Sequence, residues 1–470
     1  MCTRLPAAAA IALAAMVVVS AQTGPREVDL VVTGGTVITV DSSGRIIPSG
    51  AVAIDGSDIA AVGTADTVAK QFRGRETINA SGQIVLPGLI NTHTHAPMVL
   101  YRGLADDLPL MEWLNNYIFP AESKTVSPEF VRAGTRLAAL EMIESGTTTF
   151  ADMYYFEEEI ARETRRAGLR GVLGQTIIQF PVADAKTPAD ALARAEAYIT
   201  EFRNDSLITP AVAPHALYTL DGPTLKAARE LAKRLNVPTL IHLAESKDET
   251  KVAEERLASS PVAYLESLGF LGPGVLAAHG VWVNDADMQV LKMRGVGISH
   301  NPESNMKTAS GVAPVPAYLR AGIAVGLGTD GAASNNDLDM FEAMRVAALL
   351  HKHETVDPTA LSARTVVEMA TIRGARALGM ETRIGSLEPK KKADLITVSV
   401  SGARQTPMYD PLSHLVYVIH GDDVRNTIVN GKVLMRDRKV LTLDETSILA
   451  EARLWADKVR AAVKPAAISR

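Results

Sequence analysis

The sequence has almost no cysteine. Cys2 is the only one among 470 residues, so no disulfide can form within the chain and its body offers no thiolate to a metal or a substrate. This excludes zinc sites built on a cysteine pair, as in cytidine deaminases. Excess positive charge is also missing, because the formal net charge is −5. Nucleic-acid-binding proteins usually show a basic patch or stripe, so we expect no nucleic-acid partner.

The longest uninterrupted apolar run of the sequence lies at the N-terminus. Residues 7–19 form a short apolar run that follows Arg4 and precedes the small residues Ser20 and Ala21. The run is too short to span a membrane and is typical of a signal peptide over residues 1–21. We therefore expect cleavage near Ala21, a secreted or periplasmic protein, and no membrane segment in its mature form. The alternative is a mis-called start and a cytoplasmic protein.

The remaining sequence shows two kinds of secondary-structure pattern, and its length allows a large barrel plus a second unit. Short β-type runs with glycine turns predict a small antiparallel β-sandwich domain built from residues 22–85 and 385–445. Between them, eight alternating strand and helix patterns predict the α/β class, with a (β/α)₈ TIM-type barrel over residues 86–384. Residues 446–470 are expected to form a C-terminal helix.

The first barrel strand, expected at residues 84–90 and broken by Pro87-Gly88, is followed by His93-Thr94-His95. Residues i and i+2 of a strand face the same side, so the two imidazoles would project together. Such a pair suits a metal ion. Alone the pattern is weak, because a surface turn with two unrelated histidines would look the same.

Further polar residues follow the later strands, where the active site of a (β/α)₈ barrel lies. They are His215 after strand four, His242 and Glu245 after strand five, His279 after strand six, His300 after strand seven and Asp330 after strand eight. We predict that His93, His95, His242 and Asp330 bind one divalent ion and leave a position for water.

This arrangement suits hydrolysis, because a divalent metal lowers the pKa of bound water towards ~7. Asp330 could also take the proton of the water, and Glu245 could carry a proton to the substrate and the leaving group. His279 could orient the water and stabilise a developing oxyanion. Glu245 could instead be a solvated charge, and His279 a further ligand or a support for the ligands. We interpret His300 as mainly structural.

Four motifs in this order, "NTHTH", "IHLAES", "AAHG" and "GTDGAASNN", resemble the amidohydrolase superfamily over residues 28–440. A strand-four lysine of the kind that bridges two metals is not evident, so the resemblance is to the one-metal branch. Within it, "DDLPLMEWLNNYIFPAE", "SHNPESNMK" and "GTDGAASNNDLDMFEAMRVAALLHK" are similar to deaminases acting on 5′-methylthioadenosine and S-adenosylhomocysteine.

The resemblance implies one zinc ion on the four predicted ligands, with Fe²⁺, Ni²⁺ or Mn²⁺ as alternatives. It implies water attack on C6 of an adenine ring and release of ammonia. Glu245 resembles the proton shuttle and His279 the water-orienting histidine of the family. His215 resembles the purine contact and Glu122 the carboxylate that holds ribose hydroxyls, although a strand-end cap and a solvated charge remain alternatives. Trp113 could line the pocket or serve packing.

One position departs from the family. Gln175, in "GVLGQTII", falls where the family has an arginine for the homocysteine carboxylate, and glutamine cannot form that bidentate ion pair. Lys186 could take the place of this arginine.

The partner is thus expected to be a nucleoside or another small amino-heterocycle. A triazine chlorohydrolase or aminohydrolase, a guanine-type deaminase and a cyclic or peptide amide hydrolase remain alternatives, with a non-catalytic binding protein as the rival of another class. Barrels of this family often pair, which leaves a homo-oligomer as a further option.

Overall fold

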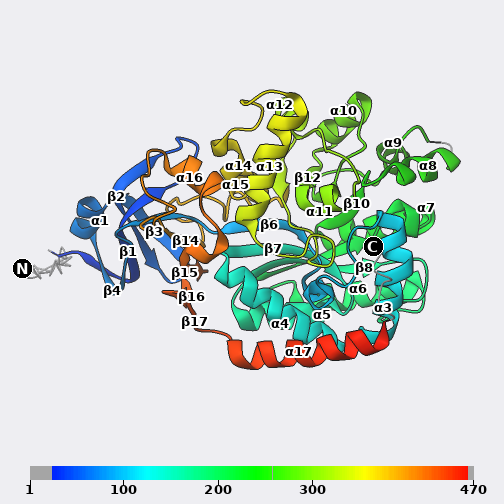
Figure 1. Ribbon diagram of the computed structural model, residues 1–470, viewed down its shortest axis with the longest axis horizontal. Coiled ribbons are helices and arrows are strands. Elements are labelled where there is room, and N and C mark those ends of the chain that lie inside the picture. Colours follow the sequence, from blue (N-terminus) through cyan, green and yellow to red (C-terminus); the bar gives the residue numbers. More distant parts are fainter. Residues whose placement is uncertain (1–23, 257, 464–470) are drawn as a thin grey trace, which may run out of the picture.

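A closed barrel and a separate sheet lie side by side in the computed structural model, which describes residues 24–256 and 258–463 (Figure 1). The barrel strands pair in parallel in the closed order β10-β11-β12-β13-β6-β7-β8-β9, which confirms the predicted fold class. The strands are β6 (Leu89–Thr94), β7 (Thr147–Tyr154), β8 (Arg170–Ile177), β9 (Ile208–Pro214), β10 (Thr239–Leu243), β11 (Val275–His279), β12 (Gly297–His300) and β13 (Val325–Leu327).

Helices with clear start signals surround the barrel. Ser127, Thr187, Asp221 and Ser260 each cap a helix with a side-chain oxygen, and a proline begins the helix that follows. The outer helices are α4 (Pro128–Glu144), α5 (Glu157–Ala167), α6 (Pro188–Phe202), α7 (Gly222–Leu235), α9 (Pro261–Ser267), α10 (Asp285–Arg294), α12 (Val315–Ala321), α13 (Met340–Thr355), α14 (Ala363–Met369) and α15 (Ile372–Ala377).

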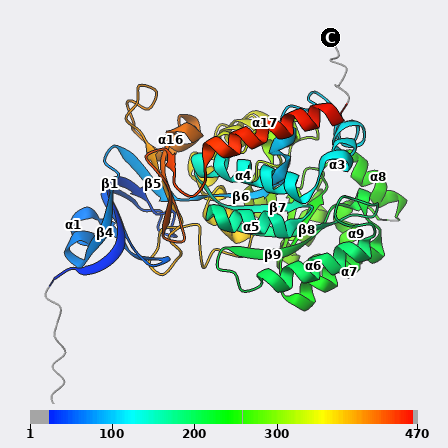
Figure 2. The ribbon, with the colours of Figure 1, turned by 90° about the horizontal axis from the view of Figure 1, so that it is seen from below.

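Additional short elements follow the carboxyl ends of the barrel strands. They are the 3₁₀ turns η1 (Ala96–Tyr101) and η3 (Leu217–Thr219), the π-helical turn η2 (Leu114–Ile118), and the helices α2 (Leu110–Trp113), α3 (Phe119–Thr125), α8 (Lys247–Glu255) and α11 (Pro302–Lys307). The C-terminal helix α17 (Glu445–Ala462) lies along α4 and α3 (Figure 2). Its Trp455 ring packs edge-on against Phe130, with ring centroids 5.4 Å apart.

The separate sheet is built from both ends of the chain, as predicted, but it is mixed and not purely antiparallel. Strand β1 has 13 residues, so one half can pair in parallel with β4 and the other with β5. The strands are β1 (Arg26–Ile38), β2 (Ile46–Asp55), β3 (Asp58–Thr64), β4 (Phe72–Asn79), β5 (Gln83–Pro87), β14 (Leu395–Ser399), β15 (Val424–Val429), β16 (Lys432–Arg436) and β17 (Lys439–Val440); α1 (Ala65–Gln71), α16 (Pro411–Tyr417) and η4 (Gly421–Asp423) lie between them.

The predicted strand at residues 84–90 is in fact two strands. Strand β5 pairs with β1 and β14 in the sheet, whereas β6 belongs to the barrel, and only Gly88 lies between them. A Cβ atom at Gly88 would lie 2.1 Å from the Thr148 hydroxyl, so no larger residue fits. The chain therefore passes from the sheet into the strand that carries His93 without any loop.

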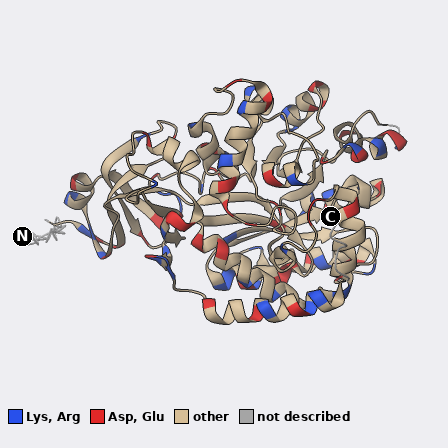
Figure 3. Ribbon diagram, in the orientation of Figure 1, with Lys and Arg blue, Asp and Glu red and all other residues tan. Residues whose placement is uncertain are grey.

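Charged side chains of both signs are interspersed along the outer helices (Figure 3). Several pair between neighbouring helices, such as Arg162 with Glu201 at 3.0 Å and Arg234 with Glu196 at 2.8 Å. Exposed pairs of this kind stabilise little, about 0–1 kcal/mol each. Of the helices within the described residues, none is long and apolar enough to cross a membrane.

Candidate metal centre and active site

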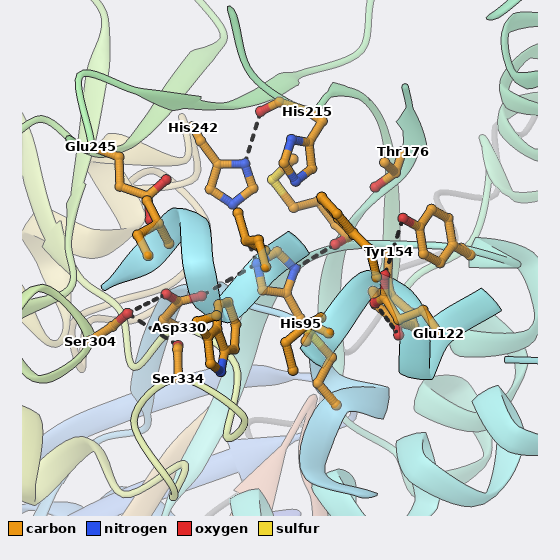
Figure 4. Close-up of a pocket in the computed structure, with 18 of the residues that line it drawn as sticks. His95, Glu122, Tyr154, Thr176, His215, His242, Glu245, Ser304, Asp330 and Ser334 are labelled. Carbon is orange, nitrogen blue, oxygen red and sulfur yellow. Dashed lines mark hydrogen bonds and ion pairs between the residues drawn. The ribbon is translucent and has the colours of Figure 1, made fainter. Parts of the chain in front are cut away.

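Four side chains converge at the carboxyl end of the barrel. His93 ends β6 with His95 just after it, and His242 lies on β10 across the barrel. The Nε2 atoms of His95 and His242 are 3.3 Å apart, and Asp330 Oδ1 lies 3.4 Å from His93 Nε2 and 3.3 Å from His95 Nε2. Figure 4 shows His95, His242 and Asp330 pointing at one another. The structure thus brings together all four predicted ligands.

Backbone carbonyls fix the tautomers of two of these histidines. His95 Nδ1 lies 2.6 Å from the Met153 carbonyl and His242 Nδ1 lies 2.8 Å from the His215 carbonyl. A carbonyl only accepts, so both Nδ1 atoms carry the proton and both Nε2 atoms present lone pairs. Two lone pairs facing each other at 3.3 Å repel unless a cation lies between them. His93 Nε2 is also buried without a hydrogen-bond partner in the described chain.

The distances fit a divalent cation such as zinc. Zinc ligands lie about 2.0–2.2 Å from the ion, and at tetrahedral angles their atoms are about 3.3–3.6 Å apart. The three distances at this site are 3.3 to 3.4 Å. Imidazole and carboxylate also suit other first-row divalent metals, so the ligands do not single out zinc.

The two histidines next to Asp330 differ in protonation as long as no metal competes with the proton. Burial lowers the pKa of His93 to about 4, which keeps the ring neutral at pH 7. Burial also opposes a charge on His95, yet the neighbouring Asp330 raises its pKa to about 9. This carboxylate therefore attracts positive charge strongly at the point where the ligand atoms meet.

Hydrogen bonds hold Asp330 in place. Its backbone has a φ of 65°, a left-handed conformation that is unfavourable for an aspartate. Ser304 donates to Oδ2 at 2.7 Å, and the Gly331 backbone N–H donates to Oδ1 at 2.8 Å. Ser334 in turn lies 3.1 Å from the Ser304 hydroxyl. The two serines were not predicted from the sequence.

His279 and Glu245 lie together beside the ligands. His279 Nε2 is 3.7 Å from a Glu245 carboxylate oxygen and is buried without a hydrogen bond to any described residue. Its Nδ1 lies 2.9 Å from Asn305 Oδ1 and 3.3 Å from Asn301 Nδ2; the shorter contact is to an oxygen, which only accepts, and favours the proton on Nδ1. Burial raises the pKa of Glu245, against a hydrogen bond that Tyr218 donates at 3.2 Å. Burial thus favours the protonated form of Glu245.

A pocket opens over this centre, with about 570 Å³ of space not filled by protein atoms, which includes open solvent. Its predicted lining residues are His215, Trp113, Glu122 and Glu245, and all four do line it. Glu122 lies on the far side from Glu245 and accepts a hydrogen bond from Tyr154 at 2.7 Å (Figure 4). Burial raises the pKa of Glu122 to about 7, although Tyr154 opposes this shift.

Gln175 does not contact the pocket, contrary to our prediction. Successive side chains of a strand face opposite sides, and on β8 it is the neighbouring Thr176 that lines the pocket. The Gln175 side chain is buried and donates to Asp184 at 2.8 Å. Lys186 is exposed and does not line the pocket. His300 also lies outside it, with its Nε2 3.0 Å from that of the buried His351.

Tyr154, Tyr155 and Tyr218 also line the pocket and were missed. The first two end strand β7 in "DMYYF", so the rule that identified the histidines could have found them. Tyr218 belongs to a 3₁₀ turn that the sequence pattern did not reveal.

Comparisons with known proteins agree with this geometry. Residues 84–434 match the model of the amidohydrolase family. A 5-methylthioadenosine/S-adenosylhomocysteine deaminase of Syntrophobacter fumaroxidans is 47% identical over 93% of this chain and 100% of its own length. A 5′-deoxyadenosine deaminase of Methanosarcina barkeri is 46% identical over 92% of this chain and 98% of its own. A crystal structure of an adenosine deaminase from Xanthomonas campestris with bound zinc is 38% identical, with a TM-score of 0.91, over 93% of this chain and all of that one.

These relatives correct the predicted localisation. We expected secretion or export to the periplasm, but the deaminases that the chain matches over nearly their whole length are enzymes of the cytoplasmic type. The leader predicted at residues 1–21 lies outside the residues that the structure describes. The export prediction is therefore wrong.

Proposed function

The chain belongs to the amidohydrolase family and is a hydrolase of C–N bonds, and from this premise we propose that it is a zinc-dependent deaminase of adenosine-type nucleosides. The reaction would add water at C6 of the adenine ring and release the amino group as ammonia. His93, His95, His242 and Asp330 would hold the zinc ion. When bound there, zinc would supply a Lewis acid that lowers the pKa of a water molecule towards neutrality.

Glu245 is the residue that we propose to handle the proton of the substrate. Burial raises its pKa and so favours the protonated form, whose proton a ring nitrogen of the purine can accept as water adds to C6. The carboxylate formed in this way can next take one proton of the added water and deliver it to the leaving amino group, while Asp330 takes the other water proton, which restores the proton on Glu245 at the end of the cycle. Tyr218, which donates to the carboxyl group, keeps it directed into the pocket.

His279 is proposed to orient the attacking water. With the proton on Nδ1, next to Asn305, the Nε2 lone pair faces the Glu245 carboxyl group, 3.7 Å away, and could accept a hydrogen bond from a water molecule there. Its backbone φ of 75° is held at the end of β11, so the ring is positioned by the barrel and not by a loop. Water and the Glu245 carboxyl group can therefore be aligned with the ring before the reaction starts.

Glu122 and His215 are proposed to bind the nucleoside. An ionised Glu122 can accept hydrogen bonds from two ribose hydroxyls. Hydrogen bonds to a charged acceptor are stronger than those between neutral groups. His215, on the strand next to His242, can contact the purine, and Trp113 supplies an apolar wall.

A single observation carries the proposal. Glu245 and His279 lie 3.7 Å apart beside the four converging ligands, in a pocket whose far side holds a buried carboxylate. Addition of water to an aromatic ring needs a proton on a ring nitrogen in the same step, which a proton donor next to the water can supply. The relatives, whose names include four adenosine-type substrates, support the same reaction.

The test is ammonia release by the zinc-loaded protein from adenosine, 5′-deoxyadenosine, 5′-methylthioadenosine, guanine and an amino-triazine. We expect turnover of the adenosines and loss of at least about 10²-fold in kcat with Glu245→Gln, which retains the metal. Metal content measured on both proteins separates a lost proton donor from a lost ion. Turnover of guanine or the triazine without the adenosines would refute the proposed substrate class.

A further inference from the structure

A second recess opens beside the pocket, on the side where Glu122 lies. It is enclosed by α3, the end of β7 and the loop that follows β8, and has about 550 Å³ not filled by protein atoms. Phe119, Glu122 and Tyr155 line both spaces, so the two are continuous at these residues. Phe180, Pro181 and Val182 complete the recess.

The loop that forms the outer wall is tied down by hydrogen bonds. The Gln179 N–H donates to the Thr219 carbonyl at 3.0 Å, and the Val182 N–H donates to the Ala185 carbonyl at 2.9 Å. Between them, the Phe180 ring packs edge-on against Phe119 with centroids 5.4 Å apart, although 39% of Phe180 remains exposed. The recess is thus already shaped, and a ligand would cover an aromatic surface that water now reaches.

The recess has an apolar wall and no positive charge. Its lining contains no lysine, arginine or histidine, and its ionisable groups are Glu122 and Tyr155. The neighbouring Arg194 is held by ion pairs to Glu158 and, at 3.4 Å, to Asp184. A carboxylate placed here would lose water without gaining an ionic partner, and Glu122 would repel it.

We propose that this recess receives the 5′ substituent of the nucleoside and selects uncharged, apolar substituents over an amino-acid tail. The inference rests on the proposed function, in which Glu122 holds the ribose hydroxyls and the purine lies by the metal ligands. A ribose held at the junction then has only the recess open to its 5′ carbon. Phe180 and Phe119, and not Gln175, would determine the specificity.

The experiment compares kcat/KM for 5′-deoxyadenosine, 5′-methylthioadenosine and S-adenosylhomocysteine with the zinc-loaded full chain. Burying a methylthio group should favour 5′-methylthioadenosine over 5′-deoxyadenosine by about tenfold. S-adenosylhomocysteine should fall below 5′-deoxyadenosine by at least about tenfold, since its charged groups lack partners.

Two variants of Phe180 test whether this residue causes the preference among the three substrates. Phe180→Ala should reduce the preference for the methylthio group by about fivefold. Phe180→Arg offers an ionic partner and should raise kcat/KM for S-adenosylhomocysteine relative to 5′-methylthioadenosine by about tenfold or more. Met293→Ala, at a 70% exposed residue on α10, is the matched control and should change neither ratio.

The outcomes separate this inference from the proposed function. Deamination of all three nucleosides at similar kcat/KM would refute the inference while the proposed function stands. Ratios that Phe180→Ala and Phe180→Arg leave unchanged would also refute it. If no adenosine is deaminated at all, the proposed function itself fails.

Discussion

Glu249 should make the protein less stable as the pH rises. It lies fully buried on α8, and its carboxyl group accepts the backbone N–H of Glu245 at 3.0 Å. Burial raises its pKa from 4.5 to about 8, although this hydrogen bond and one from Ala244 oppose the shift. Between these two values the folded protein keeps a proton that the unfolded chain has lost. The free energy of unfolding therefore falls as pH rises through this window.

The size of the effect follows from the shift. Each pH unit inside the window changes the free energy of unfolding by about 1.4 kcal/mol, so the loss from pH 5 to pH 7.5 is on the order of 3 kcal/mol. Glu249→Gln keeps an oxygen acceptor but cannot ionise. It should match the wild type near pH 5 and exceed it by up to about 3 kcal/mol near pH 7.5.

Glu249→Leu separates the hydrogen bond from the charge. It leaves the Glu245 N–H buried without an acceptor, so it should be less stable than Glu249→Gln by about 1–3 kcal/mol at both pH values. Because the N–H belongs to the proposed proton donor, kcat should also fall in the leucine variant and be preserved in the glutamine variant. Urea unfolding followed by tryptophan fluorescence at the two pH values measures the stabilities. An equal stability difference between wild type and Glu249→Gln at pH 5 and pH 7.5 would refute the reasoning.

Two further predictions concern other buried charges. Because the pKa of Glu122 is raised to about 7, kcat/KM for adenosine should rise as pH increases through this value, and Glu122→Gln should remove this pH dependence. If the wild type shows the same pH dependence with a 2′,3′-dideoxy nucleoside, the proposed role of Glu122 is contradicted. Arg170 on β8 pairs with Asp394 of the sheet at 2.8 Å, both side chains being at most 3% exposed. Arg170→Met should lower the free energy of unfolding by about 3–5 kcal/mol, measured in urea, and adding Asp394→Leu should recover part of the loss; a double variant less stable than the single one would show that the lone carboxylate is not the cause.

The convergence of the four candidate metal ligands was predictable, because one rule of barrel geometry places them. Parallel strands of a closed barrel end at one rim, so polar residues that follow successive strands must meet there. His93, His95, His242 and Asp330 are separated by up to 237 positions in sequence, yet this rule alone brings them together. The Ser304 contact to Asp330 was not predictable in this way, because Ser304 lies on the short helix α11 that follows β12, and the rule for strand ends does not give the direction of a side chain on a helix.

The incorrect predictions concern positions where a shift of one residue along a strand changes which side chain faces the pocket or which sheet the strand joins. Gln175 and Thr176 are neighbours on β8, and only the register of the strand determines which of them faces the pocket. In the same way, residues 84–90 read as one apolar strand, because both β5 and β6 are buried and periodicity cannot show a change of sheet. The pairing partners β14 and β13, more than 200 residues away, make that distinction.

The single-residue junction at Gly88 affects the order in which the protein can form during synthesis. Strand β5 pairs with β14, which begins at Leu395, so its pairing waits until most of the chain has been made. The strand that carries His93 is joined directly to β5 and closes the barrel against β13, which also comes late. A nascent chain therefore carries its first two histidines for most of translation before their site can assemble. Premature termination anywhere before residue 395 would yield a chain that cannot complete the sheet beside the metal centre.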